Sequence, residues 1–244
     1  MANTYFQFKE FIVHQEHASM KVCTDACFFG AWAIHHEALQ KASSVLDIGT
    51  GTGLLSLMIA QKNTLGTITA VEIEPNAANQ ALSNFALSPW KERLSVVNAS
   101  IQDFASTNSA RFDCIISNPP FFESDLPSPN DQKNVAAHSV ALPWETFAQV
   151  VSKLLMNNGC FYVIIPSIRA YTMQKLMETN GLQLIEETTV FNKEKQLPFR
   201  SFLQFKKATE KLASIERNKL YIKGPSNKYT DEFKSLLKAY YLQF

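Results

Sequence analysis

The middle of the chain alternates between short apolar runs and longer stretches with helical periodicity. The apolar runs are rich in β-branched and aromatic residues and stop at polar ones, which predicts buried strands. These runs are residues 43–48, 66–74, 93–100, 111–118 and 160–166. The stretches between them predict helices over residues 52–62, 75–87, 143–159 and 170–181. Strands that alternate with helices indicate an α/β fold with an open, mostly parallel sheet and helices on both faces.

The pattern changes near the C-terminus. Residues 182–191 and 200–207 are two strand-like runs with no helix between them, so we expect an antiparallel hairpin at the edge of the sheet. Residues 229–244 predict an amphipathic helix that Thr230 caps. The expected fold is therefore Rossmann-like and doubly wound, with a mostly parallel seven-stranded sheet and an antiparallel edge hairpin.

The length of 244 residues and the hydrophobic content of 46% fit one domain with a sizeable core. We expect a single domain over residues 1–244, divided into an N-terminal segment (1–40), a core (41–207) and a basic C-terminal extension (208–244). Within the first segment, residues 5–13 fit either a strand or a cap. The sequence has neither a membrane-length apolar stretch nor the features of a secretory signal, so the expected location is the cytoplasm. A monomer is the default expectation.

The cysteines and histidines indicate no metal site. Cys23 and Cys27 are not spaced as a CxxC pair, and Cys114 and Cys160 lie inside apolar runs, which favours buried, reduced thiols. The five histidines form no signature such as HExxH. We therefore expect the protein to bind no metal.

The charge is unevenly distributed although the net charge is only +1. Residues 191–244 contain twelve Lys or Arg and five Asp or Glu, which gives +7, whereas the remaining residues carry −6. A basic C-terminal part on an acidic body favours a polyanion on one side, although a solvated lysine-rich face gives the same count.

A glycine-rich stretch, DIGTGTG, follows the first predicted core strand. Gly49, Gly51 and Gly53 lie where the strand turns into a helix and allow a ligand to approach the backbone closely. Their spacing differs from the GxGxxG pattern that binds a dinucleotide pyrophosphate. Glu72 ends the second strand about twenty residues later, where an acid accepts hydrogen bonds from both ribose hydroxyls and repels a 2′-phosphate. Together these features indicate an adenosine-containing cofactor without a pyrophosphate.

The stretch SNPPFF, residues 117–122, ends the fourth predicted strand. Asn118 supplies a side-chain carbonyl, and Pro119 fixes its own φ and restricts the residue before it. By itself such a stretch fits a tight turn under a strand. After DIGTGTG and VEIE, however, it resembles the class I S-adenosylmethionine-dependent methyltransferases, over roughly residues 45–205.

This resemblance implies S-adenosyl-L-methionine as the cofactor and assigns residues to it. The methionine part would lie over Asp47, Gly49, Thr50 and Gly51, and Glu72 with Ile73 would lie at the ribose. The stretch ASIQD would line the adenine through Ser100 and Ile101. Many members of the family have an acid at the position of Ser100, so either Ser100 or Asp103 would accept from the adenine amino group.

The same resemblance gives SNPPFF a catalytic role. Families with Asn-Pro-Pro-aromatic methylate a nitrogen whose lone pair is delocalised. Asn118 and the backbone of Pro119 would accept hydrogen bonds from that nitrogen, Pro120 would make the corner rigid, and Phe121 would stack on the base. The methyl group then transfers in line, by proximity and orientation, without a strong general base.

The N-terminal segment also resembles one subfamily, the bacterial tRNA1(Val) adenine-N6 methyltransferases, which act on adenine 37 beside the anticodon. Their MKV-TD---LGAWA block matches Met20, Lys21, Val22, Thr24, Asp25, Gly30, Ala31 and Trp32. In that family the block folds over the cofactor pocket, which assigns Lys21 and Thr24 to the cofactor. The C-terminal YTDEFKSLLKAYYL resembles the ending of the same family.

The resemblance makes an RNA adenine-N6 methyltransferase acting on tRNA the leading hypothesis. Phe121 differs from the tyrosine usual in that subfamily, and guanine-N2 methyltransferases often carry NPPF. Methylation of guanine N2 in rRNA or of a protein glutamine, and a non-catalytic S-adenosylmethionine-binding module, therefore remain as alternatives. For a tRNA substrate, Lys193, Lys195, Arg200, Lys206 and Lys207 form a candidate phosphate-binding face, and the loop 123–139 is expected to cover the acceptor.

Overall fold

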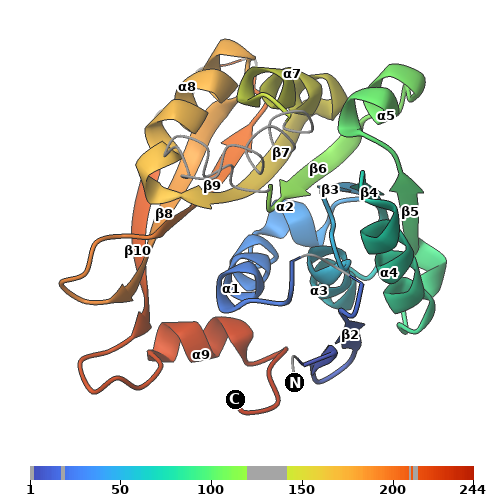
Figure 1. Cartoon of the computed structure of the whole chain (residues 1–244). Coiled ribbons are helices and arrows are strands. Elements are labelled where there is room, and N and C mark those ends of the chain that lie inside the picture. The colour runs from blue at the N-terminus through green and yellow to red at the C-terminus, as the bar shows by residue number, and fades with distance from the viewer. Residues whose placement is uncertain (1–2, 18–19, 120–141, 209, 211–213) are drawn as a thin grey trace, which may run out of the picture.

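A computed structural model describes residues 3–17, 20–119, 142–208, 210 and 214–244 (Figure 1). Its centre is an eight-stranded sheet in the order β10-β8-β9-β7-β6-β3-β4-β5. The strands of this sheet are β3 (Ser44–Ile48), β4 (Thr67–Glu72), β5 (Leu94–Asn98), β6 (Phe112–Ser117), β7 (Leu155–Pro166), β8 (Gln183–Lys193), β9 (Arg200–Lys206) and β10 (Glu216–Lys223). A separate hairpin joins β1 (Tyr5–Gln7) and β2 (Ile12–His14).

The sheet confirms the expected class I methyltransferase architecture. Strands β3 to β7 run parallel, and β9 runs antiparallel to both β7 and β8. The seven predicted strands correspond to β3–β9. The sequence interpretation missed β10, which pairs in parallel with β8, so β10 forms the edge outside the predicted hairpin.

Helices cover both faces of the sheet (Figure 1). The helices are α1 (Thr24–Ala33), α2 (Glu37–Gln40), α3 (Leu54–Lys62), α4 (Pro75–Ala86), α5 (Ile101–Thr107), α7 (Trp144–Leu154), α8 (Ala170–Thr179) and α9 (Asp231–Leu237), with 3₁₀ turns η1 (Lys91–Arg93) and η2 (Ser167–Arg169). One apolar core joins α1, α3, α4 and α9 to one face, and a second core joins α5, α7 and α8 to the other. Two buried faces explain why the central strands are apolar at consecutive positions.

Several helix ends follow from local chemistry. Pro75 occupies the first position of α4, where its missing N–H leaves no donor unpaired. The Thr230 hydroxyl accepts from the N–H of Phe233 and caps α9 as expected. The helix predicted to run to Gly159 instead ends at Leu154, because β7 begins at Leu155 and Asn158 adopts a positive φ of 64°. The last residues of the predicted helix, 155–159, therefore belong to the strand.

The N-terminal hairpin confirms the strand alternative for residues 5–13. It packs beside the C-terminus, where the Lys9 ammonium donates to the carbonyls of Lys238 and Phe244. The His14 backbone exchanges two hydrogen bonds with the Asn84 amide on α4. These contacts hold the hairpin against α4 and the C-terminal residues.

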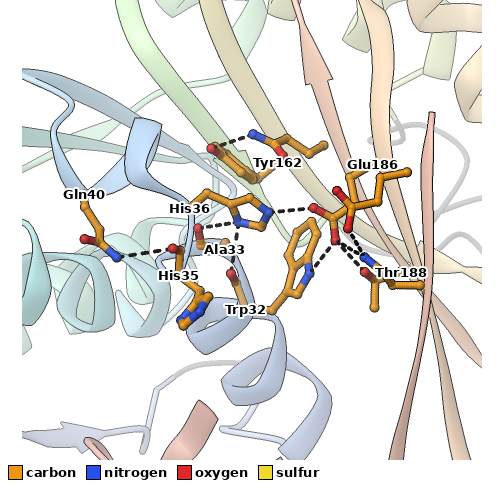
Figure 2. A network of polar contacts seen from close by, with 11 residues as sticks. Trp32, Ala33, His35, His36, Gln40, Tyr162, Glu186 and Thr188 are labelled. Carbon is orange, nitrogen blue, oxygen red and sulfur yellow. Dashed lines mark hydrogen bonds and ion pairs between the residues drawn. The ribbon is translucent and has the colours of Figure 1, made fainter. Parts of the chain in front are cut away.

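A polar network joins the end of α1 to the edge of the sheet (Figure 2). His36 Nε2 lies 2.8 Å from Glu186 Oε2 on β8, and its Nδ1 lies 3.1 Å from the carbonyl oxygens of both Trp32 and Ala33. Carboxylate and carbonyl oxygens only accept hydrogen bonds, so His36 donates to both sets of oxygens when both ring nitrogens carry protons. When protonated, His36 forms an ion pair with Glu186 that holds the end of α1 against β8.

In the part of the chain that the structure describes, none of the helices has the length and apolar character needed to cross a membrane.

Candidate active site

The candidate site lies where three neighbouring parallel strands end. The register pairs Ile48 at the end of β3 with Ser117 on β6 and with Val71 on β4. The chain leaves these ends as the glycine loop, as Glu72 and its following turn, and as Asn118. In open α/β sheets this carboxyl edge is the usual ligand-binding position. A cavity of about 200 Å³ lies there.

The glycine loop forms the floor of the cavity. Gly49 and Gly51 line it and have positive φ angles of 69° and 57°, which favour glycine. The N–H groups of Gly49 and Thr50 both donate to the Val71 carbonyl, which fixes the loop on β4. A Cβ added at Gly49 or Gly51 would meet no atom within 4 Å, so the backbone faces open space. The loop can therefore admit a ligand against its main chain.

Glu72 supplies a negative charge to the cavity and is only 8% exposed. One carboxylate oxygen accepts from the Gly51 N–H at 2.8 Å and the other accepts from the Glu74 N–H at 3.0 Å. Each oxygen retains a lone pair for a hydroxyl group. Ile73, which is 52% exposed, lines the cavity beside it. The geometry suits two adjacent hydroxyls held over the glycine loop.

Asp47 lies beneath the loop and is completely buried. Its Oδ2 accepts from Thr50 Oγ1 at 2.6 Å and from Ser56 Oγ at 2.7 Å. Burial raises the pKa of this carboxyl group to about 6, although the two hydroxyl hydrogen bonds oppose the shift. Thr50 lines the cavity, and Asp47 is not among the described lining residues. In this geometry Asp47 braces the loop from below.

Ser100 and Asp103 bond to each other at the start of α5. The Ser100 hydroxyl accepts from the Asp103 N–H and donates to the Asp103 carboxylate at 2.7 Å. Ile101 is buried in the core behind them. None of the three is among the described residues that line the cavity. The spacing Ser-x-x-Asp is an N-terminal capping signal, which the sequence analysis could have used to find this arrangement.

The N-terminal segment provides one wall of the cavity through Met20, Lys21, Val22 and Ala26. Thr24 is exposed at the first position of α1 and does not line the described part of the cavity. The segment is anchored because Gln15 Oε1 accepts from the Val22 N–H.

Asn118 lines the cavity at the end of β6. Its Nδ2 lies 3.9 Å from the sulfur of Met20, and its Oδ1 is buried without a hydrogen-bond partner among the described residues. A buried amide oxygen is normally bonded, because desolvation without a partner is unfavourable. Pro119 follows and is buried. Pro120, Phe121 and the loop 123–139 lie outside the described residues.

Several described residues line the cavity although the sequence analysis assigned them no role. Thr52 and Glu74 could have been found from their places next to the glycine loop and Glu72. Leu54, Leu55 and Ala77 come from the first turns of α3 and α4 and read as ordinary core residues. Met20 and Val22 belonged to the matching N-terminal block, but nothing in their chemistry indicated a cavity.

The proposed lysine face is divided between two rims of the sheet. Arg200 pairs with Pro166 at the end of β7, whereas Lys206 pairs with Cys160 at the opposite end of the same strand pair. The Lys207 ammonium donates to the carbonyls of Ser152 and Leu155. Lys206 and Lys207 therefore lie far from Asn118, and the expectation of one continuous face that includes them is wrong.

Arg200 has a local partner on the cofactor side. Its Nε donates to Asp25 Oδ2 at 2.9 Å, and both side chains are at most one-quarter exposed. This ion pair holds the start of α1 against β9. No group of His, Cys, Asp and Glu able to hold a metal ion occurs within residues 3–17, 20–119, 142–208, 210 and 214–244.

Comparisons of the fold agree with this geometry. A crystal structure from Agrobacterium tumefaciens, described as a predicted O-methyltransferase, superposes with a TM-score of 0.64 at 15% identity and covers 88% of this chain and 95% of its own. Magnesium protoporphyrin IX methyltransferase from Synechocystis, crystallised with bound S-adenosylmethionine, has a TM-score of 0.53 at 11% identity and covers 75% and 78%. At such low identity these likenesses show the fold alone.

Comparisons of the sequence extend over the whole chain. The family model of the methyltransferase small domain matches residues 31–191. The tRNA1(Val) (adenine(37)-N6)-methyltransferase of Dyadobacter fermentans is 41% identical over 99% of both chains, and that of Escherichia coli O157:H7 is 36% identical over 97% of this chain and 94% of its own. The chain therefore belongs to the tRNA1(Val) (adenine(37)-N6)-methyltransferase family of S-adenosylmethionine-dependent enzymes.

Proposed function

We propose that the protein transfers a methyl group from S-adenosyl-L-methionine to the exocyclic N6 of adenine 37, beside the anticodon of tRNA1(Val). The observation that carries the proposal is the position of Asn118. Asn118 lines a cavity whose floor is a glycine loop and whose wall contains Glu72, and its amide oxygen has no hydrogen-bond partner among the described residues. The full-length identity to curated enzymes with this activity supports the same substrate. A tRNA substrate places the reaction in the cytoplasm.

The described residues fit S-adenosyl-L-methionine. Gly49 and Gly51 leave space against the backbone for the methionine part, and Glu72 retains acceptor capacity for the two ribose hydroxyls. Lys21 lies on the same cavity from the N-terminal wall. Asp47 keeps the loop in place through Thr50 and Ser56. When bound, the cofactor supplies a methyl group on a sulfonium that makes it electrophilic.

The acceptor nitrogen is a weak nucleophile because its lone pair is delocalised into the adenine ring. Asn118 Oδ1 and the backbone carbonyl of Pro119 would each accept one N–H of the amino group, which biases the lone pair towards the methyl group. Proline fixes its own φ, so these acceptors need little reorganisation in the transition state. Pro120 and Phe121 would complete the corner as a rigid link and a stacking surface.

Access to the amino group requires an unstacked base. A nucleotide in an anticodon loop is extruded at lower cost than one inside a duplex. The chemistry of Asn118 therefore suits a loop adenine better than a paired one.

Methyl transfer to separated nucleic acid and protein fractions tests the proposal. Purified enzyme and labelled S-adenosylmethionine should label tRNA from a strain that lacks the gene, and nuclease digestion should release N6-methyladenosine. Label in rRNA as 2-methylguanosine, or in protein, would replace the proposed acceptor. Label in no fraction would leave a non-catalytic binding module.

A further inference from the structure

One face of the edge strand β10 and its neighbour β8 combines lysines with an aromatic pair. Side chains two positions apart on a strand point to the same face, and partners in register do so as well. The register pairs Phe191 with Tyr221 and Lys193 with Lys223. Lys219 lies two positions before Tyr221, so it shares this face. We call these residues the basic edge face.

The opposite face of the same strands is buried. Val190 on β8 and Ile222 on β10 belong to the core that contains Phe233 of α9. Alternation along the strands therefore turns Phe191 and Tyr221 away from α9, whereas the Lys223 ammonium lies 5.9 Å from the ring centroid of Tyr229, which stacks on Phe233. Figure 1 shows β10 at the outer edge of the sheet with α9 below it. The basic edge face is thus formed by the strands themselves and not by flexible termini.

The aromatic pair and the lysines are arranged as a platform. The rings of Phe191 and Tyr221 stack with centroids 5.0 Å apart and an interplanar angle of 24°, and both residues are half-buried. Lys193 and Lys223 lie side by side in register, where like charges repel each other. Neither of them nor Lys219 forms an ion pair with a residue that the structure describes. An anion between them would relieve the repulsion.

The platform lies on the same rim of the sheet as Asn118. Lys193 ends β8 beside the start of β9, and Arg200 at that start pairs with Pro166 at the carboxyl end of β7. Strand β7 is parallel to β6, which ends next to Asn118. Four strand spacings separate β10 from β6, which is about 19 Å along the sheet. An RNA that places one base at Asn118 can therefore extend over the platform.

We propose that the basic edge face binds the tRNA substrate, its lysines on phosphates and its aromatic pair under an unpaired base next to the target adenine. This inference rests on the proposed function. Phosphate contacts supply most sequence-independent affinity for nucleic acids, and aromatic rings stack on any unpaired base. Lysines on an edge strand also prevent pairing with another sheet. That protective role requires no RNA contact, so measurements of tRNA affinity distinguish it from the proposed RNA-binding role.

The test compares two triple variants in the full-length protein. Lys193→Gln/Lys219→Gln/Lys223→Gln removes three charges from the basic edge face. Lys62→Gln/Lys91→Gln/Lys153→Gln removes three from the opposite rim, at the end of α3, in η1 and at the end of α7. Tyr221→Ala and Tyr221→Phe form a second pair, because phenylalanine keeps the stack. Affinity for S-adenosylmethionine and thermal unfolding check that each variant is folded.

The first triple variant should raise the KM for a tRNA1(Val) transcript roughly tenfold and leave kcat nearly unchanged. The slope of log affinity against log salt concentration should become shallower by about two. The control triple variant should match the wild type. Tyr221→Ala should weaken tRNA binding roughly tenfold, and Tyr221→Phe should restore it.

If the two triple variants bind tRNA with equal affinity and equal salt slope, the inference is wrong. The proposed function still stands in that case, provided that the wild type methylates tRNA. If the wild type methylated no tRNA, the proposed function would fail, and this inference with it. If the Tyr221→Ala protein is unfolded, the lysine variants decide the question alone.

Discussion

Glu72 holds the glycine loop directly, because its carboxylate accepts the Gly51 N–H at 2.8 Å while the other oxygen accepts the Glu74 N–H. The residue assigned to the ribose therefore also shapes the loop assigned to the methionine part. Ligand binding and loop geometry at this cavity are coupled through one side chain.

Replacing Glu72 should weaken both cofactor binding and folding. Glu72→Ala removes the proposed ribose acceptor and leaves two backbone N–H groups without it. We expect a loss of about 2 kcal/mol in the free energy of unfolding and at least a roughly tenfold loss of S-adenosylmethionine affinity. Titration calorimetry and chemical denaturation measure the two effects. Exposed Glu92 in η1 is a matched control, and equal cofactor affinity in Glu72→Ala and Glu92→Ala would refute the assignment.

Gly51→Ala tests whether the glycine loop faces the cofactor. Gly51 and Gly181 both have positive φ, 57° and 82°, and a Cβ at either one meets no atom within 4 Å. Each alanine should therefore cost a similar backbone strain of about 1 kcal/mol. The methyl group at position 51 also enters the cavity, so that variant alone should lose cofactor affinity, by roughly tenfold or more. The same affinity in both variants would show that the loop does not contact the cofactor.

The ion pair between His36 and Glu186 should make stability depend on pH. Burial opposes the charge on His36, but Glu186 and two backbone carbonyls outweigh it and raise the pKa of His36. Burial also opposes the charge on Glu186, but hydrogen bonds from His36, Thr188 and Asn218 lower the pKa of Glu186 to about 2. Tyr162, whose ring centroid lies 5.4 Å from that of His36, is another titratable group beside it.

The sign follows from linkage between protonation and folding. The contribution of His36 is complete below its unfolded pKa of about 6.5 and is lost as the pH rises through its higher folded pKa. The contribution of Glu186 is complete above about 4.3 and is lost as the pH falls towards 2. His36→Gln should therefore lower the free energy of unfolding by about 2 kcal/mol at pH 6 and by less at pH 9. Exposed His35→Gln is the control, and an identical loss at both pH values would contradict the ion pair.

Arg200 should act on stability and not through phosphate contacts. Its bond to Asp25 joins β9 to the start of α1, with both side chains largely buried. Arg200→Gln leaves Asp25 without this partner and should lower the melting temperature by several degrees. The salt dependence of tRNA binding should stay within error of the wild type. A shallower salt slope without loss of stability would return Arg200 to the RNA-binding face.

The sequence predicted the strands that build the site because each contains a short, mostly apolar run that stops at polar residues. Strands β3 and β6 end at Ile48 and Ser117, which a glycine and an amide follow at once, and β4 ends at the acid Glu72 itself. Strand β10 was missed because five of its eight residues are charged or polar, so only Leu220 and Ile222 alternate as an edge strand requires. Its pairing with β8 depends on register, which local composition does not encode.

The same limit applies inside the site. Asp47 and Thr50 belong to one sequence motif, but strand alternation places the carboxylate under the loop and the loop geometry places Thr50 on the cavity. The interpretation of Ser100 as an adenine contact depended on the family resemblance, whereas the described hydrogen bonds join Ser100 to Asp103. Packing decides which atoms face a cavity. The positions of residues in a motif therefore predict that their side chains lie near the cavity, but not which way each side chain points.

The central claim is that Asn118 accepts a proton of the adenine amino group beside the cofactor cavity. Single-turnover methyl transfer to a tRNA1(Val) transcript by Asn118→Ala, with S-adenosylmethionine affinity measured on the same protein, tests it most directly. The rate should fall by about 10²- to 10³-fold while cofactor affinity changes little, and Asn118→Asp, which keeps an acceptor oxygen, should lose less. A near-normal rate for Asn118→Ala with intact cofactor binding would contradict the account.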